Sequence, residues 1–193
     1  MLVVIWALRL GGYLAWRSRG EGEDVRYRDL VGERKGFKRI GRLLVVVYGL
    51  QALMMVIVAS PLVVAITQQS ALGLLGFLGI IACVFGISFE TAADWQLSRF
   101  RARGGSGVLA AGLWARSRHP NYFGEAVVWW GFFLLATASV YGFFTIISPL
   151  VMTWLLVKVS GRDLLERHLV ATKSEYRSYV EQVPSFIPRW KAR

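Results

Sequence analysis

The chain has 193 residues but only one cysteine, Cys83, and only 12 acidic residues against 23 lysines and arginines. A single cysteine excludes a scaffold held together by intrachain disulfides. Aromatic residues make up 13% of the sequence, which excludes an intrinsically disordered chain. The sequence also lacks the cysteine and histidine spacing of a zinc site and the glycine-rich loop with lysine of a nucleotide-binding P-loop. We therefore expect no metal site.

Hydrophobic residues make up 55% of the chain, and the formal net charge is +11. The apolar content exceeds that of an ordinary soluble domain. A DNA-binding domain could have this charge but not this hydrophobicity. The combination is typical of a multi-pass membrane protein with basic loops on one side, and it requires no nucleic acid partner.

Three uncharged runs are long enough to cross a bilayer, which takes about 20 mostly apolar residues per helix. They cover residues 43–66, 71–89 and 126–157. The last run is too long for one helix, so we predict two spans with a break near 137–142.

Residues 1–16 are apolar except for Arg9 and are too short to cross comfortably. A signal peptide is disfavoured, because no basic region precedes the apolar stretch and no small-residue cleavage site follows it. Trp16, Arg17 and Arg19 resemble a boundary anchor. We interpret this stretch as the last part of a longer helix.

Lysine and arginine are concentrated in alternate connections. Nine lie in residues 17–42, five in 99–118 and eight in the tail from Lys158, whereas the short turns hold none. The positive-inside rule therefore places residues 17–42, 99–120 and 160–193 in the cytoplasm.

The predicted fold class is all-α. We expect one membrane-embedded domain over 1–193, a transmembrane helix bundle with about four full spans plus a partial N-terminal helix. Residues 162–183 alternate charged and apolar residues at helical spacing, which predicts a cytoplasmic amphipathic helix on the membrane. Glu166 and His168 of this helix could face a site, although His168 could equally be a surface or packing histidine.

Ionisable residues near membrane spans are functional candidates because burying them is costly. Glu90, Asp94 and Arg101 fall on one helical stripe if the helix continues past the membrane, and Arg99 points the other way. The alternative is a solvated helix end with an internal ion pair.

A second cluster precedes and begins the next helix. Pro120 is typical of a first helical residue, which puts His119 or Ser117 at the cap and Arg116 and Arg118 just outside. A helix start offers free N–H groups and the positive end of the helix dipole. With two arginines and a histidine around it, this helix start predicts an anion site, with phosphate as the guest.

Glu125 follows about one turn into the membrane, on the face of Asn121 and Tyr122. A buried carboxylate there needs a partner or a proton. The alternative is a boundary anchor with a capped helix. We favour a functional site, because three polar residues share the face.

Four segments together resemble the bacterial steroid 5-alpha-reductase-like membrane proteins, which are related to 3-oxo-5-alpha-steroid 4-dehydrogenases. They read FETAADWQLSRFR, GLWARSRHPNYFGEAVVWWGFFL, VSGRDLLERHL and YRSYVEQVPSFIP, and the resemblance covers essentially the whole chain. The resemblance implies reduction, by NADPH, of a carbon–carbon double bond conjugated to a ketone in a steroid or other lipid. It also implies a bacterial inner membrane protein with the cofactor site facing the cytoplasm.

The resemblance and the predicted anion site together give the expected site residues. Glu125 and Tyr122 are expected to take part in catalysis. The cofactor is expected to contact Arg9, Tyr13, Glu90, Asp94, Arg101, Arg116, Arg118, His119, Asn121, Glu125, His168 and Tyr179.

The chain departs from this family at its N-terminus. The family uses a Glu–Tyr pair from its N-terminal helices to polarise the substrate. This chain begins after the region that supplies the Glu, and the Tyr position falls near Trp6. We expect a member that lacks the family's most N-terminal helices.

Two other function classes remain open. The Arg-His-Pro-x-Tyr core also occurs in lipid and isoprenylcysteine methyltransferases, which use S-adenosylmethionine. A non-catalytic membrane binding protein would explain the short N-terminus. The charge of the guest discriminates, because the three phosphates of NADPH account for the cationic set of Arg101, Arg116, Arg118 and His119, whereas a sulfonium cofactor has no phosphate.

Overall fold

A computed structural model describes residues 1–19, 41, 45, 48–68, 71–105, 107–159 and 174–190. They belong to two compact units, Met1–Ala59 and Ser60–Arg193, which we describe separately. The secondary structure of the described residues is helical and contains no strand. The predicted all-α fold class is therefore confirmed for this part of the chain.

The first unit contains α1 (Leu2–Arg17) and the beginning of α4 (Leu50–Thr67). In α1 the guanidinium of Arg9 lies 5.8 Å from the centroid of the Tyr13 ring, one turn away. The Tyr13 ring in turn lies 6.1 Å from that of Trp16. The polar residues expected on this helix therefore share one face with its aromatic residues.

The helix α4 contains Pro61 in its interior. A proline breaks one backbone hydrogen bond of a helix, but membrane helices tolerate it when neighbouring groups compensate. The predicted span 43–66 is observed in its second part, as α4, whereas several residues between 41 and 49 lie outside the described set.

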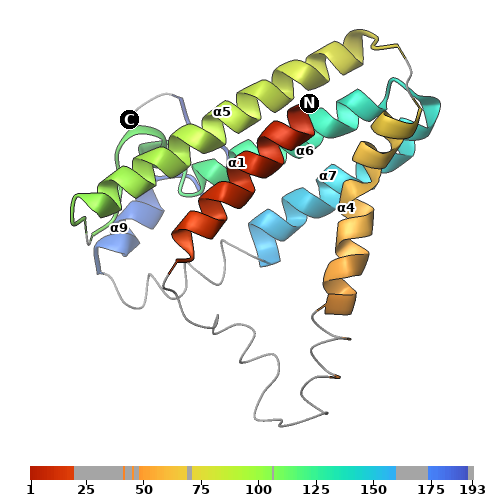
Figure 1. The fold of residues 1–193 in the computed structure, drawn as a ribbon. Helices are drawn as coiled ribbons and strands as arrows, with labels where there is room; N and C mark the ends of the chain where they lie inside the picture. The colour runs from red at the N-terminus through yellow and green to blue at the C-terminus, as the bar shows by residue number, and fades with distance from the viewer. Residues whose placement is uncertain are drawn as a thin grey trace. The chain divides into compact units, whose positions relative to one another are not determined.

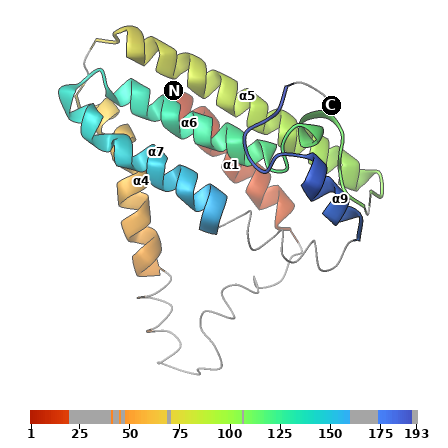
Figure 2. The ribbon, with the colours of Figure 1, turned by 180° about the vertical axis from the view of Figure 1, so that it is seen from behind.

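The second unit is built on α5 (Leu74–Ala102) and α6 (Pro120–Ala136). Figures 1 and 2, seen from opposite sides, both show α6 lying along α5. With 29 residues, α5 is about 43 Å long, more than the hydrocarbon core of about 30 Å. The helix therefore continues beyond the apolar run 71–89, as the predicted stripe of Glu90, Asp94 and Arg101 requires.

The long uncharged run breaks where the sequence predicts. The helix α6 ends at Ala136, and three short helical elements then follow without interruption: η3 (Val140–Ile146), α7 (Ile147–Trp154) and the π-helical η4 (Leu155–Val159). The Ser139 hydroxyl accepts a hydrogen bond from the Tyr141 N–H, 3.3 Å, and so caps η3. A Cβ at Gly142 would overlap the Ala136 carbonyl, so this turn requires glycine.

Small residues bring α5 and α6 into close contact. A Cβ at Gly79 would lie 2.7 Å from the Gly131 carbonyl oxygen, and a Cβ at Gly86 would lie 2.7 Å from that of Gly124. Between these two points the Cys83 thiol is fully buried and donates to the Val128 carbonyl, 3.6 Å. Membrane helices associate through such small-residue surfaces, since lipid provides no hydrophobic drive between them.

The opposite face of α5 is apolar and open. Phe77, Ile81 and Phe85 are 58%, 51% and 44% exposed. Among the described residues, three helical stretches are long and apolar enough to cross a membrane: Leu50–Thr67, Leu74–Ala102 and Val140–Lys158. These features indicate a membrane-embedded protein.

Two shorter elements complete the second unit, η2 (Gly112–Ala115) and α9 (Ser174–Gln182). The predicted amphipathic helix 162–183 is observed only in its last part, as α9, because residues 160–173 lie outside the described set. The chain then leaves the helical conformation after Gln182, near the predicted break at Val183.

Candidate functional site

Buried polar side chains gather where the second half of α5 passes the first turns of α6. Glu90 and Asp94 on α5 are each only 3% exposed. Asn121, in the first turn of α6, donates a hydrogen bond from Nδ2 to Oδ1 of Asp94, 3.2 Å. The two motifs that the sequence offers separately therefore meet in one place.

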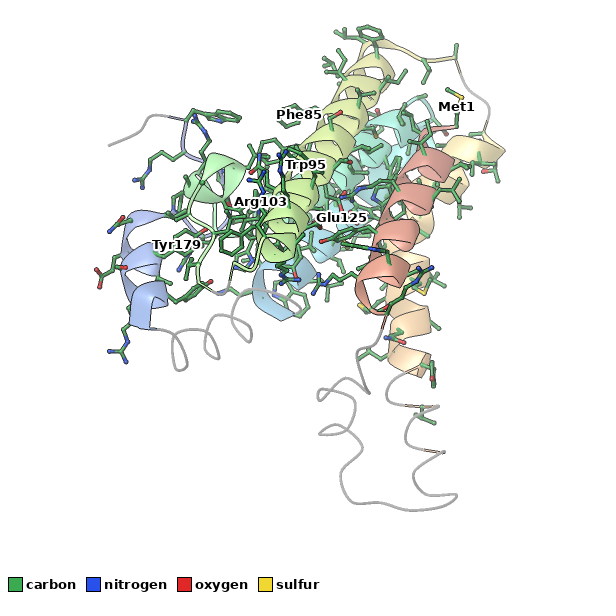
Figure 3. The ribbon with its side chains drawn as sticks, turned by 60° about the vertical axis from the view of Figure 1, so that its left-hand side comes forward. Met1, Phe85, Trp95, Arg103, Glu125 and Tyr179 are labelled. Atoms are coloured by element: carbon green, nitrogen blue, oxygen red, sulfur yellow. The ribbon has the colours of Figure 1, made fainter. Side chains whose placement is uncertain are left out.

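Glu125 lies one turn further along α6 and is 5% exposed. Its Oε1 accepts a hydrogen bond of 2.9 Å from the indole Nε1 of Trp129, the residue one turn on. Figure 3 labels Glu125 beside the half of α5 that bears Trp95 and Arg103. We call Glu90, Asp94, Asn121 and Glu125 the polar cluster.

Gly124 allows the two helices to approach at the polar cluster. A Cβ at this position would lie 2.8 Å from the backbone nitrogen of Glu90 and 2.9 Å from its Cβ. Any side chain here would push α6 away from α5. Within the described ranges, no three His, Cys, Asp or Glu side chains are placed to hold a metal ion.

The start of α6 is buried. Pro120 is its first residue, as predicted, and His119 is the N-cap residue. The His119 N–H donates to the Ser117 hydroxyl oxygen, 3.2 Å, and the His119 ring stacks on Tyr122 with centroids 5.4 Å apart. Ser117 is fully buried, and Arg118 is 7% exposed. The sequence offered His119 and Ser117 as alternative caps, and the structure puts His119 at the N-cap position, with Ser117 holding the backbone N–H of His119.

Residues 184–190, which we call the C-terminal segment, bind the residues just before α6. The Arg118 N–H donates to the Pro184 carbonyl, 2.9 Å, and the Arg189 N–H donates to the Arg116 carbonyl, 2.9 Å. The Ser117 hydroxyl donates to the Phe186 carbonyl, 2.8 Å. Three consecutive residues are therefore fixed by a segment about 70 positions away in the sequence.

Aromatic side chains anchor the C-terminal segment to both helices. The Phe186 ring meets that of Phe123 on α6 edge-on, with centroids 6.0 Å apart. The Trp190 ring lies 6.3 Å from that of Phe89 on α5. Arg116 joins this contact, because its Nη1 donates to the Trp190 carbonyl, 2.9 Å, and its guanidinium lies 5.3 Å from the Trp190 ring.

Arg99 and Arg101, in the last turn of α5, are both exposed. The guanidinium of Arg99 lies over the Trp95 ring, 5.1 Å from its centroid. Along the predicted stripe Glu90 and Asp94 are buried and Arg101 is open to solvent, so this arginine lies on the rim and outside the polar cluster.

Tyr179 packs α9 against η2. Its hydroxyl donates to the Trp114 carbonyl, 2.6 Å, and its ring belongs to a small core with Tyr176 and Val183. In the other direction, the indole of Trp114 donates to the Ala93 carbonyl on α5, 3.0 Å. Tyr179 is thus linked to the helix of the polar cluster through η2, and Figure 3 labels it on α9.

Three expected site residues do not belong to the described part of the second unit. His168 lies outside the described residues. Arg9 and Tyr13 belong to the first unit, where they contact each other.

Comparison with known proteins places the chain in a family. Residues 1–183 match a family described as a protein of unknown function, DUF1295. The chain belongs to this family. No curated protein and no solved structure matches the chain.

The DUF1295 match covers the polar cluster and the start of α6, and it ends at residue 183. The C-terminal segment that fixes Arg116, Ser117 and Arg118 therefore lies just beyond the matched region.

Three contributors to the site were missed by sequence reasoning. Trp129 could have been found, because an indole one turn after a buried carboxylate is a natural hydrogen-bond donor. Gly124 also carries a signal, as a small residue in a membrane helix. Trp190 carries none, because its role depends on a contact across 74 positions of sequence.

Proposed function

We propose that the protein is a membrane-bound, NADPH-dependent reductase of a carbon–carbon double bond conjugated to a ketone, acting on a steroid-like or other lipid substrate. The family is related to steroid 5-alpha-reductase-like proteins. The observation that carries the proposal is the hydrogen bond from Asn121 to Asp94. It joins the two segments, around Asp94 and around Asn121, that resemble this family, and buried Glu90 and Glu125 belong to the same two segments.

The hydrogen-bonding groups of the polar cluster suit the ribose and nicotinamide parts of NADPH. Carboxylates accept hydrogen bonds from ribose hydroxyls and from the carboxamide N–H group, and an asparagine can both donate and accept. Asp94, Glu90 and Asn121 would hold these parts. Arg118, at the buried start of α6, and Arg101, on the rim, would hold phosphates by charge-assisted hydrogen bonds.

The bound cofactor would supply hydride to the β-carbon of the enone. Glu125 would orient the carboxamide or hold a proton near the reacting carbon, as a positioned acid–base group does. Its hydrogen bond from Trp129 fixes one carboxylate oxygen and so sets the direction of the other. Tyr122, held by its stacking on His119, would donate a hydrogen bond from its phenol.

The apolar surroundings suit a lipid substrate. The exposed apolar face of α5 and the span Val140–Lys158 would lie in the bilayer, so that a hydrophobic enone reaches the site from the membrane. The five arginines of residues 99–118 favour a cytoplasmic cofactor side by the positive-inside rule. A bacterial inner membrane fits this orientation.

A second candidate, an S-adenosylmethionine-dependent lipid or isoprenylcysteine methyltransferase, is favoured by a different feature of the same site. Glu90, Asp94 and Glu125 are three buried carboxylates near one crossing. A cationic sulfonium would be stabilised by such an acidic set. The guanidinium of Arg116, which contacts Trp190, weakens the case for a site built around phosphates.

Cofactor binding separates the two candidates. Protein purified in detergent is titrated with NADPH, NADH and S-adenosylmethionine, and then assayed for NADPH oxidation with a panel of enones. The reductase is supported by NADPH binding and enone-dependent oxidation. Binding of S-adenosylmethionine alone would replace it with the methyltransferase.

A further inference from the structure

Arg116 contacts the end of the C-terminal segment with both its side chain and its backbone. Its guanidinium donates to the Trp190 carbonyl and lies against the Trp190 ring, and its own carbonyl accepts from the Arg189 N–H. A guanidinium that both stacks and donates in this way uses its planar shape, which lysine cannot reproduce.

The other bonds of the C-terminal segment fall on the next two residues. Ser117 donates to Phe186, and Arg118 donates to Pro184. Ser117 also receives the N–H of His119, the N-cap of α6. The segment thus controls the backbone path into α6, whose first turn carries Asn121.

We propose that residues 184–190 are a positioning element of the cofactor site, and that Arg116 acts through this segment instead of binding a phosphate. This inference rests on the proposed function for the identity of the ligand. The line of contacts runs from Trp190 to Arg116, through Ser117 and His119, to Asn121 and its bond with Asp94.

The rest of the second unit has its own support. The crossing of α5 and α6 is held by the close contacts of Gly79 with Gly131 and of Gly86 with Gly124, which do not involve Trp190. Trp190 itself is 62% exposed, so its removal uncovers little buried surface. Loss of the end of the segment should therefore displace the start of α6 without unfolding the helix pair.

A double-mutant cycle tests this assignment. Wild type, Arg116→Ala, a chain that stops after Arg189, and the combination are compared for binding of NADPH and of S-adenosylmethionine. Each single change should weaken binding of the cofactor that wild type takes by about tenfold. The combination should weaken it by about the same factor, because each change already removes the contact between Arg116 and Trp190. Additive losses, about a hundredfold together, would show that Arg116 binds the ligand directly and would overturn the proposal.

Two further variants sharpen the cycle. Arg116→Lys keeps the charge but loses the planar stack, so it should bind as poorly as Arg116→Ala; retained affinity would point to a phosphate ligand. Arg103→Ala is the matched control, because it removes one exposed positive charge at the end of α5. A loss in Arg103→Ala equal to that in Arg116→Ala would reduce the effect to net charge and overturn the assignment.

Hydrogen exchange provides a readout that needs no cofactor. In the chain that stops after Arg189, the hydrogen-bonded amides of Ser117, Arg118 and His119 should exchange faster, whereas those of residues 79–93 should stay protected. Unchanged exchange at these three amides would overturn the proposal. If wild type binds neither cofactor, the proposed function fails, and exchange still decides whether the segment holds the start of α6.

Discussion

Asn121 on α6 donates a hydrogen bond to the carboxylate of Asp94 on α5, and these residues lie 27 positions apart in the sequence. The bond joins the end of a membrane span to the start of the next helix. Hydrogen bonds between membrane helices are worth about 0.6–2 kcal/mol. Its value here lies in register, because it aligns the face of α6 that bears Glu125 with the stripe of α5 that bears Glu90.

The close packing of the two helices gives the first prediction. Gly79→Ala should lower the free energy of unfolding by about 1–3 kcal/mol, since its Cβ would meet backbone atoms of Gly131 and Leu135 at 2.7 and 2.9 Å. Gly73→Ala is the control, because a Cβ there meets no described atom within 4 Å. Thermal unfolding in detergent measures both, and equal melting temperatures would contradict the packing.

Much of the helical layout could be predicted because its signals are local. Pro120 marks the start of α6, and the break after Ala136 follows from the length a bilayer allows. The shared face of Glu90 and Asp94 follows from the helical period, once α5 continues past the membrane. Their burial does not follow from it, because it depends on the packing of α6 against α5.

The remaining parts of the site depend on contacts between distant segments. Ser117 and Arg118 bond to the carbonyls of Phe186 and Pro184. Backbone carbonyls exist at every residue, so these pairings leave no trace in the sequence. For the same reason the arginines of the expected anion site could not be told apart, and the structure separates Arg116, against Trp190, from Arg101, on the rim.

Orientation in the membrane is the second prediction. Single cysteines at Leu72, Arg103 and Ile187, all exposed positions, are labelled on intact cells with an impermeant maleimide. The basic excess predicts labelling of Leu72→Cys from outside, and of Arg103→Cys and Ile187→Cys only after permeabilisation. The native Cys83 is fully buried, so wild type should remain unlabelled. Labelling of position 103 or 187 on intact cells would contradict the predicted cytoplasmic location of these segments.

The third prediction concerns the rim of the site. Arg101→Ala should weaken NADPH binding by about 1.5 kcal/mol, the lower end for hydrogen bonds to charged groups, because this arginine is exposed. The loss should shrink as salt rises, since screening weakens exposed charges. Arg99→Ala is the matched control, because Arg99 is exposed and lies on Trp95. Calorimetric titration of both at low and high salt checks this, and equal losses would remove Arg101 from the site.

The last prediction is that Glu125→Gln folds normally but loses most enone reduction. Glutamine keeps an oxygen that can accept the Trp129 N–H, so the buried hydrogen bond of 2.9 Å survives and the melting temperature should be unchanged. What disappears is the carboxylate, and with it the ability to hold or move a proton. A positioned acid–base group contributes about 10²-fold or more to the rate, so turnover should fall by at least about that factor. NADPH oxidation with a panel of enones measures the rate, and a thermal-shift assay checks folding.

Trp129→Phe is the companion variant, because it keeps the carboxylate and removes its hydrogen-bond donor, so it should retain more activity than Glu125→Gln. A Glu125→Gln protein that is destabilised, yet turns over normally per folded molecule, would show that Glu125 is a packing residue, because its carboxylate would then be needed for the contact with Trp129 and not for the reaction.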